Sequence, residues 1–157
     1  MSLWVREKIQ ALSRAANLTP RKLSINVAAG VLTDNLGRVL IAQRPAGAHQ
    51  AGWWEFPGGK INASESAYDG LVRELVEEIG VTVHAARELL TYTHEYPERF
   101  VTLHVFNVTN YSGRPTGVEG QALQWESVAS LMQVGLLPAD LPIVDALSKM
   151  RPDPTVP

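Results

Sequence analysis

Residues 59–81 read GKINASESAYDGLVRELVEEIGV and combine a glycine loop, an amphipathic segment and a dense group of carboxylates. Ser66 is a suitable N-cap, with Asp69 three residues later as an imperfect capping box. Gly80 is typical of the position just after a helix. The pattern predicts a helix between Ser66 and Gly80. Its buried stripe, at helical spacing, should consist of Leu71, Leu75 and Ile79.

The polar side of this helix carries three carboxylates. At about 100° per residue, Glu74, Glu77 and Glu78 project from one side, opposite the apolar stripe. Like charges four residues apart destabilise a helix by roughly 0.2–0.5 kcal/mol, and a hard divalent cation offsets such repulsion. A solvated acidic face would explain three glutamates alone. It does not explain why a glycine loop, Glu65 and Arg73 accompany them at fixed spacing.

Gly59 to Val81 matches every defined position of the motif of the Nudix hydrolases, G-x5-E-x7-R-E-U-x-E-E-x-G-U, where U is aliphatic. The chain therefore resembles this family. Its resemblance to MutT-type nucleoside triphosphate pyrophosphohydrolases covers roughly residues 24–148. The stretches that carry it outside the motif are 39–45, 54–60, 117–121 and 138–142. The implied fold is α/β: a Nudix α/β/α sandwich with a mixed β-sheet, plus a short N-terminal helix.

The resemblance implies hydrolysis of a nucleoside triphosphate to the monophosphate and pyrophosphate, with water attacking the β-phosphorus while Mg²⁺ or Mn²⁺ is bound. It implies that Glu74, Glu77 and Glu78 bind the metal, together with the backbone carbonyl of Gly59. Glu119 matches a carboxylate outside the motif that approaches the metals and can act as a base. A solvated loop glutamate is the alternative for Glu119.

The resemblance also implies a set of substrate contacts. Glu65 and Arg73 are expected to form a structural ion pair that holds the loop and the helix in register. His49 is expected to be a hydrogen-bonding imidazole rather than a metal ligand, because Mg²⁺ prefers oxygen. The residues that match phosphate-, sugar- or base-contacting positions are Arg44, His49, Lys60, Arg99 and Asp140.

Two substrates remain open within this class. The first is 8-oxo-dGTP, as in enzymes that sanitise the nucleotide pool, and the second is CTP or a modified dCTP. Asp140 departs from the Asn that commonly reads 8-oxoguanine, since an ionised carboxylate accepts hydrogen bonds but cannot donate them. Asp140 could instead cap a helix that begins at Leu141-Pro142. A binding-only domain is the third alternative, although such domains usually show an eroded motif.

The composition of the chain excludes or disfavours other classes of protein. The chain has 157 residues, no cysteine and a net charge of −2, which excludes disulfide scaffolds and thiol chemistry and argues against binding of a nucleic-acid polymer. No apolar run reaches the roughly 20 residues of a membrane span. We expect a cytoplasmic enzyme, monomeric or homodimeric, without a secretory signal. The expected divisions are residues 1–22 (a helical extension, helix 3–16), 23–150 (the Nudix domain) and 151–157 (a tail).

The remaining elements follow from hydrophobic periodicity and turn residues. A strand at 23–32 and a strand at 39–41 are expected to form a hairpin around the turn 34–37. The other expected strands lie near 88–96, 100–109 and 123–125, and two short helices near 127–133 and 140–150. Such an order favours a mixed sheet between helical layers.

Overall fold

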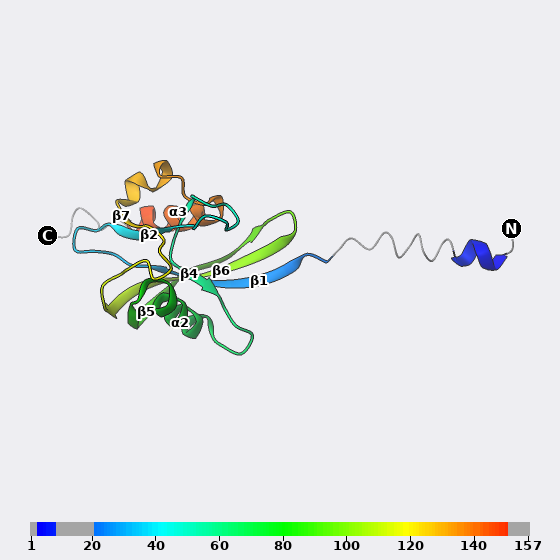
Figure 1. The fold of residues 1–157 in the computed structure, drawn as a ribbon, viewed down its shortest axis with the longest axis horizontal. Coiled ribbons are helices and arrows are strands. Elements are labelled where there is room, and N and C mark those ends of the chain that lie inside the picture. The colour runs from blue at the N-terminus through cyan, green and yellow to red at the C-terminus, as the bar shows by residue number, and fades with distance from the viewer. Residues whose placement is uncertain (1–2, 9–20, 151–157) are drawn as a thin grey trace.

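Two β-sheets form the centre of the fold in the computed structural model, which describes residues 3–8 and 21–150 (Figure 1). The first sheet has the strand order β4-β1-β6-β5 and the second has the order β3-β2-β7. The strands of the first sheet are β1 (Leu23–Val31), β4 (Gly58–Lys60), β5 (Thr82–Glu95) and β6 (Arg99–Ser112). Those of the second are β2 (Val39–Gln43), β3 (Trp54–Glu55) and β7 (Leu123–Glu126).

The first sheet is mixed, as predicted, because β1 runs parallel to β6 while β4 and β5 pair antiparallel. The predicted hairpin forms only next to its turn, where Thr33 and Val39 make an antiparallel bridge. Asp34 does turn the chain, since its side chain accepts hydrogen bonds from the backbone of Leu36 and Arg38. The backbone N–H of Leu40 also donates to the carbonyl of Leu32 at 3.0 Å, but all nine residues of β1 pair with β6 rather than with β2.

Helix α2 (Ala67–Ile79) confirms the prediction from the motif. The Ser66 side chain accepts from the backbone N–H of Asp69, and Gly80 ends the helix in the left-handed conformation with φ 69°. A residue with a Cβ would be strained there. The stripe of Leu71, Leu75 and Ile79 is completely buried. The apolar side of α2 therefore anchors the helix and leaves its carboxylates on the other side.

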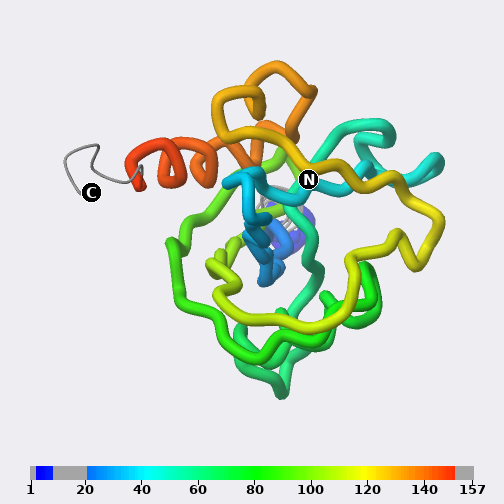
Figure 2. Tube along the Cα trace, turned by 90° about the vertical axis from the view of Figure 1, so that its left-hand side faces the viewer, coloured from blue at the N-terminus to red at the C-terminus, as the bar shows by residue number. Residues whose placement is uncertain are grey.

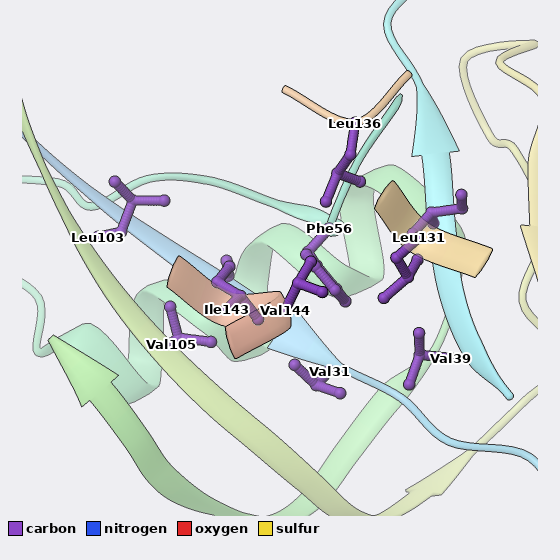
Figure 3. Packing of buried hydrophobic residues seen from close by; sticks show 11 residues of the cluster. Val31, Val39, Phe56, Leu103, Val105, Leu131, Leu136, Ile143 and Val144 are labelled. Carbon is purple, nitrogen blue, oxygen red and sulfur yellow. The ribbon is translucent and has the colours of Figure 1, made fainter. Parts of the chain in front are cut away.

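Alternate residues of β1 and β6 supply two hydrophobic clusters on opposite faces of the first sheet. Ala28 and Phe106 face α2 in one cluster. Figure 3 shows the other cluster, in which Phe56 lies beside Ile143 and Val144. Figures 1 and 2 place α2 and the C-terminal helix on opposite sides of the sheets. This is the predicted sandwich of helices and sheet.

The C-terminal part is more segmented than predicted. Residues Val128–Gln133 form a 3-10 helix (η1), and a 3-10 turn at Pro138–Asp140 (η2) precedes α3 (Leu141–Lys149). Strands β5 and β6 are longer than expected. Residues 3–8 are helical, with exposed Leu3 and Trp4, while residues 9–16 of the expected helix and the tail 151–157 lie outside the described residues.

Candidate active site

One pocket of about 330 Å³ collects every residue that the resemblance assigns to substrate binding. They come from the loop after β2, from β4, from the start of β6 and from η2, so no local segment could have built the site. Glycines 58 and 59 form part of the wall, and the β1 and β6 side chains form its apolar base. The five residues are Arg44, His49, Lys60, Arg99 and Asp140.

Arg44 is held by a carboxylate that the sequence analysis did not assign. Its Nη1 contacts Glu55 Oε2 at 2.9 Å, and its Nε donates to the carbonyl of His49 at 2.6 Å. Burial raises the pKa of Glu55, and the Arg44 charge opposes that shift. The pair orders the loop that carries His49. The signal available beforehand was a charged residue between two aromatic ones, Trp54 and Phe56.

Tyr96 adds an aromatic face to the pocket and was also missed. Its ring lies edge-on to His49 and His94, with centroid distances of 6.2 and 4.7 Å. The Arg99 guanidinium lies 5.3 Å from the centroid of the Tyr96 ring. A cation over an aromatic ring is held electrostatically. Aromatic side chains in nucleotide sites also stack on nucleobases. Its position in the Tyr96-Pro97 turn was the available signal.

Asp140 is 5% exposed, and its side chain contacts the residue that follows β3 rather than its own helix. Its Oδ2 accepts from the backbone N–H of Phe56 at 2.9 Å, and no side-chain hydrogen bond caps α3. Asp140 therefore occupies the expected N-cap position of α3, but its side chain does not cap the helix. Burial raises the Asp140 pKa to about 7, helped by Glu55 and opposed by the Phe56 N–H and by Arg44. The carboxyl can thus change protonation state near neutral pH.

Glu78 and Glu74 flank the glycine loop from α2. The Oε2 of Glu78 accepts from the backbone N–H of Gly58 at 2.7 Å. Burial raises the pKa of Glu78 to about 8, with further increases from Glu55, Glu74 and Glu119. Glu74 packs so closely on Gly59 that an added Cβ would lie 2.2 Å from its Oε2. Only glycine leaves the backbone there open to a ligand.

Arg73 connects the loop 58–65 to α2. It makes a two-pronged contact with Glu65, at 2.5 Å from Nη2 to Oε1 and 3.1 Å from Nε to Oε2. Its Nη2 also donates to the carbonyl of Lys60 at 2.8 Å. Hydrogen bonding to Arg73 lowers the pKa of Glu65. The structure therefore contains the ion pair expected from the resemblance.

The three helix carboxylates do not converge on one point. Glu77 is 59% exposed and lies 3.4 Å from Arg73, which also holds Glu74 at 2.7 Å. Within residues 3–8 and 21–150, no three carboxylates or histidines are close enough to hold a metal. The donor set still fits a hard divalent cation. Glu74 and Glu78 are one helical turn apart beside an open backbone, so side-chain rotation can join their oxygens.

Glu119 lies apart from the substrate pocket. It lines a more open groove that shares Arg44 with the first pocket. It is nevertheless close enough to Glu78 for its charge to raise the pKa of that residue. The expected carboxylate outside the motif is therefore near Glu78, in a groove that shares Arg44 with the pocket.

Comparison with known proteins defines the class. The NUDIX domain matches residues 28–146, and the chain belongs to this family. It is 39% identical to a "CTP pyrophosphohydrolase" of Escherichia coli over 81% of this chain and 93% of that protein. It is 34% identical to an "8-oxo-dGTP diphosphatase" of the same organism, over 80% and 98% of the two chains.

Solved structures agree with this assignment. The E. coli ORF135 protein matches with a TM-score of 0.74 and 36% identity, over 88% of this chain and 99% of that chain. A MutT structure, described in a study of the enzymes of Aliivibrio salmonicida and Vibrio cholerae, matches with a TM-score of 0.70 and 32% identity, covering 81% and 99%. Nudix hydrolases generally need a divalent metal. In the described part of the chain, no helix is both long and apolar enough to span a bilayer.

Proposed function

We propose that this protein hydrolyses a modified or ordinary nucleoside triphosphate to the monophosphate and pyrophosphate, with 8-oxo-dGTP as the first candidate substrate. The observation that carries the proposal is the pocket that collects Arg44, Lys60 and Arg99. Two glycines of its lining, Gly58 and Gly59, lie against Glu78 and Glu74 of α2. The cationic side chains of the pocket can bind phosphate groups, and the adjacent aromatic and carboxyl groups can bind a nucleobase. The relatives named above support the reaction class.

The proposed role of each site residue follows from its position in the pocket or on α2. Lys60 and Arg44 contact phosphate oxygens, Tyr96 and Arg99 cover the base, and Asp140 reads its edge. Glu74, Glu77 and Glu78 would hold the divalent cation, proposed to be Mg²⁺ or Mn²⁺, with the Gly59 carbonyl. The bound cation supplies charge neutralisation at the phosphates and activation of water. Glu119 is proposed to orient or deprotonate the attacking water.

The protonation of Asp140 supports 8-oxo-dGTP. Its pKa of about 7 leaves a substantial protonated fraction at neutral pH. A protonated carboxyl donates to O6 of 8-oxoguanine, whereas an ionised one accepts from N7–H. Since Oδ2 is engaged by Phe56, a single oxygen serves the base.

The same residue gives the second candidate, CTP or a modified dCTP. An ionised Asp140 accepts a hydrogen bond from the N4 amino group of cytosine. The similarity to a CTP pyrophosphohydrolase supports this alternative. Both candidates keep the reaction and differ only in the base.

A substrate panel tests both the class and the base. Pyrophosphate release would be measured with Mg²⁺ and then Mn²⁺ on 8-oxo-dGTP, dGTP, CTP and 5-methyl-dCTP. The proposal expects release from at least one, with the largest kcat/KM for 8-oxo-dGTP. A larger value for CTP would select the second candidate, and release from none would refute the reaction. Gel filtration and cell fractionation would test the accompanying proposals of a monomer or homodimer and of a cytoplasmic location.

A further inference from the structure

The loop between β6 and β7 closes the C-terminal end of α2. The backbone N–H of Thr116 donates to the carbonyl of Ile79 at 2.9 Å, and that of Val118 donates to the carbonyl of Glu78 at 3.1 Å. Carbonyls in the last turn of a helix have no partner within the helix, so these bonds attach the loop to α2. Glu119, the next residue, is thereby carried to the turn that presents Glu78.

Gln121 makes a side-chain bridge between these two glutamates. Its Oε1 accepts from the backbone N–H of Glu119 at 3.0 Å. Its Nε2 donates to the backbone carbonyl of Glu78 at 2.9 Å. A neutral amide carries a donor and an acceptor in one rigid plane, so one side chain satisfies both backbone groups. A carboxylate or an apolar side chain of similar length cannot make both bonds.

The backbone of Gln121 is itself fixed. The next residue, Ala122, accepts from the backbone N–H of Gln43 at 2.9 Å, which attaches it to β2. Gly117 approaches so closely that an added Cβ would lie 2.0 Å from the carbonyl oxygen of Gln121. The backbone of Gln121 is therefore held next to the second sheet, while its side-chain amide bonds to the helix and to the loop. The position of β2 thus determines where the amide lies.

We infer that Gln121 is a positioning residue that sets the backbone of Glu119 relative to that of Glu78. This inference rests on the proposed function, in which both glutamates serve the hydrolysis of a triphosphate. Glu78 is in turn bonded to the N–H of Gly58 at 2.7 Å, so the amide connects Glu119 to the glycine loop. A misplacement of about 1 Å at such a site lowers rates by about 100-fold.

A double-mutant cycle tests the inference. Gln121→Met keeps the length of the side chain and removes both hydrogen bonds, while Gln121→Glu keeps only the acceptor. Each would be combined with Glu119→Gln, and pyrophosphate release would give kcat and KM on the best substrate of the panel. Thr116→Val is the matched control, because it removes a hydrogen bond from Thr116 to Arg114 within the same loop. Thermal melting would show that each variant is folded.

The expected result is a 10- to 100-fold lower kcat for both Gln121 variants, a KM within about threefold of wild type and full activity in Thr116→Val. In the Glu119→Gln background, replacing Gln121 should lower kcat by less than about threefold, because the two residues act as a unit. Wild-type kcat in folded Gln121→Met, multiplied losses in the double variant, or an equal loss in Thr116→Val would each overturn the inference. A wild-type chain that releases no pyrophosphate overturns the proposed function, and the inference with it.

Discussion

The carboxylate of Asp140 accepts a hydrogen bond from the backbone N–H of Phe56 at 2.9 Å, although 84 residues separate the two in the sequence. Phe56 is buried in the cluster that also contains Ile143 of α3. The bond therefore joins η2 to the segment that enters the glycine loop. Tyr92 of β5 supports the same turn, since its hydroxyl donates to the carbonyl of Ala139 at 2.6 Å. Asp140 is thus fixed from two sides.

Asp140→Asn should change the choice of base. The amide oxygen of Asn can still accept from the Phe56 N–H, which turns the NH₂ group toward the ligand. That group donates to O6 of 8-oxoguanine but cannot accept from N4 of cytosine. We expect the ratio of kcat/KM for 8-oxo-dGTP over CTP to rise more than about tenfold, or 1.4 kcal/mol. An unchanged ratio in a folded variant would show that Asp140 does not contact the base.

Asp140→Asn should also change how stability depends on pH. The Asp140 pKa is about 7 in the folded protein against an ordinary value of 3.8 for aspartate, so between these values the folded state binds more protons than the unfolded state. The contribution of this group to the free energy of unfolding is therefore complete below about pH 4, falls as pH rises, and is lost above about pH 7.

Urea unfolding of wild type and Asp140→Asn at several pH values would measure this difference. Relative to wild type, the variant should gain about 1–4 kcal/mol between pH 4.5 and 7.5, because asparagine does not titrate. Asp145→Asn is the control, since Asp145 lies on α3 with its side chain 67% exposed. Parallel profiles for wild type and Asp140→Asn would contradict the assigned shift.

Glu78→Gln should lower kcat by at least about 10³-fold, or some 4 kcal/mol of activation free energy. Glutamine keeps the shape and the hydrogen bond from Gly58 but removes the charge that would face a cation. EDTA should abolish turnover of the wild type, and added Mg²⁺ should restore it. Near-normal turnover in the folded variant, or activity that survives EDTA, would remove Glu78 and the metal from the mechanism.

Glu65→Gln should reduce activity less than Glu78→Gln and leave the Mg²⁺ concentration for half-maximal rate within about threefold of wild type. Glu65 accepts hydrogen bonds from Arg73 and from the backbone N–H of Asn62. Removal of its charge therefore weakens the attachment of the loop to α2 and leaves the proposed metal ligands in place. A Mg²⁺ titration of the rate would measure both effects. Equal weakening of Mg²⁺ dependence in the two variants would reverse the assigned roles.

Gly58→Ala should destabilise the protein by more than about 3 kcal/mol, because its Cβ would lie 2.0 Å from the backbone oxygen of Ala28. The strands β4 and β1 would have to separate. Gly37→Ala is the matched control: its φ is +75° with nothing within 4 Å of the added Cβ, so only the backbone strain of about 1 kcal/mol is expected. Denaturant midpoints would compare the two, and equal losses would contradict the close approach.

Elements whose causes are local could be predicted from the sequence. The helix α2, with its cap at Ser66, its end at Gly80 and its buried stripe, follows from residue type and spacing within one segment. The identity of the carboxylates and of the Glu65–Arg73 pair also came from that segment and the family it resembles. Periodicity and capping depend on neighbours along the chain, so they can be predicted from the sequence.

The contacts between distant segments could not be predicted in this way, because they depend on how the whole chain packs. Tertiary structure paired β1 with β6 instead of β2, because strand pairing depends on what else the whole chain offers each edge. It turned Asp140 away from the helix that follows it and onto Phe56, and it placed Gln121 between Glu119 and Glu78. The same packing of distant segments buries the Asp140 carboxyl and thereby raises its pKa. Hydrogen bonding and desolvation act through space, and the packing of distant segments determines them.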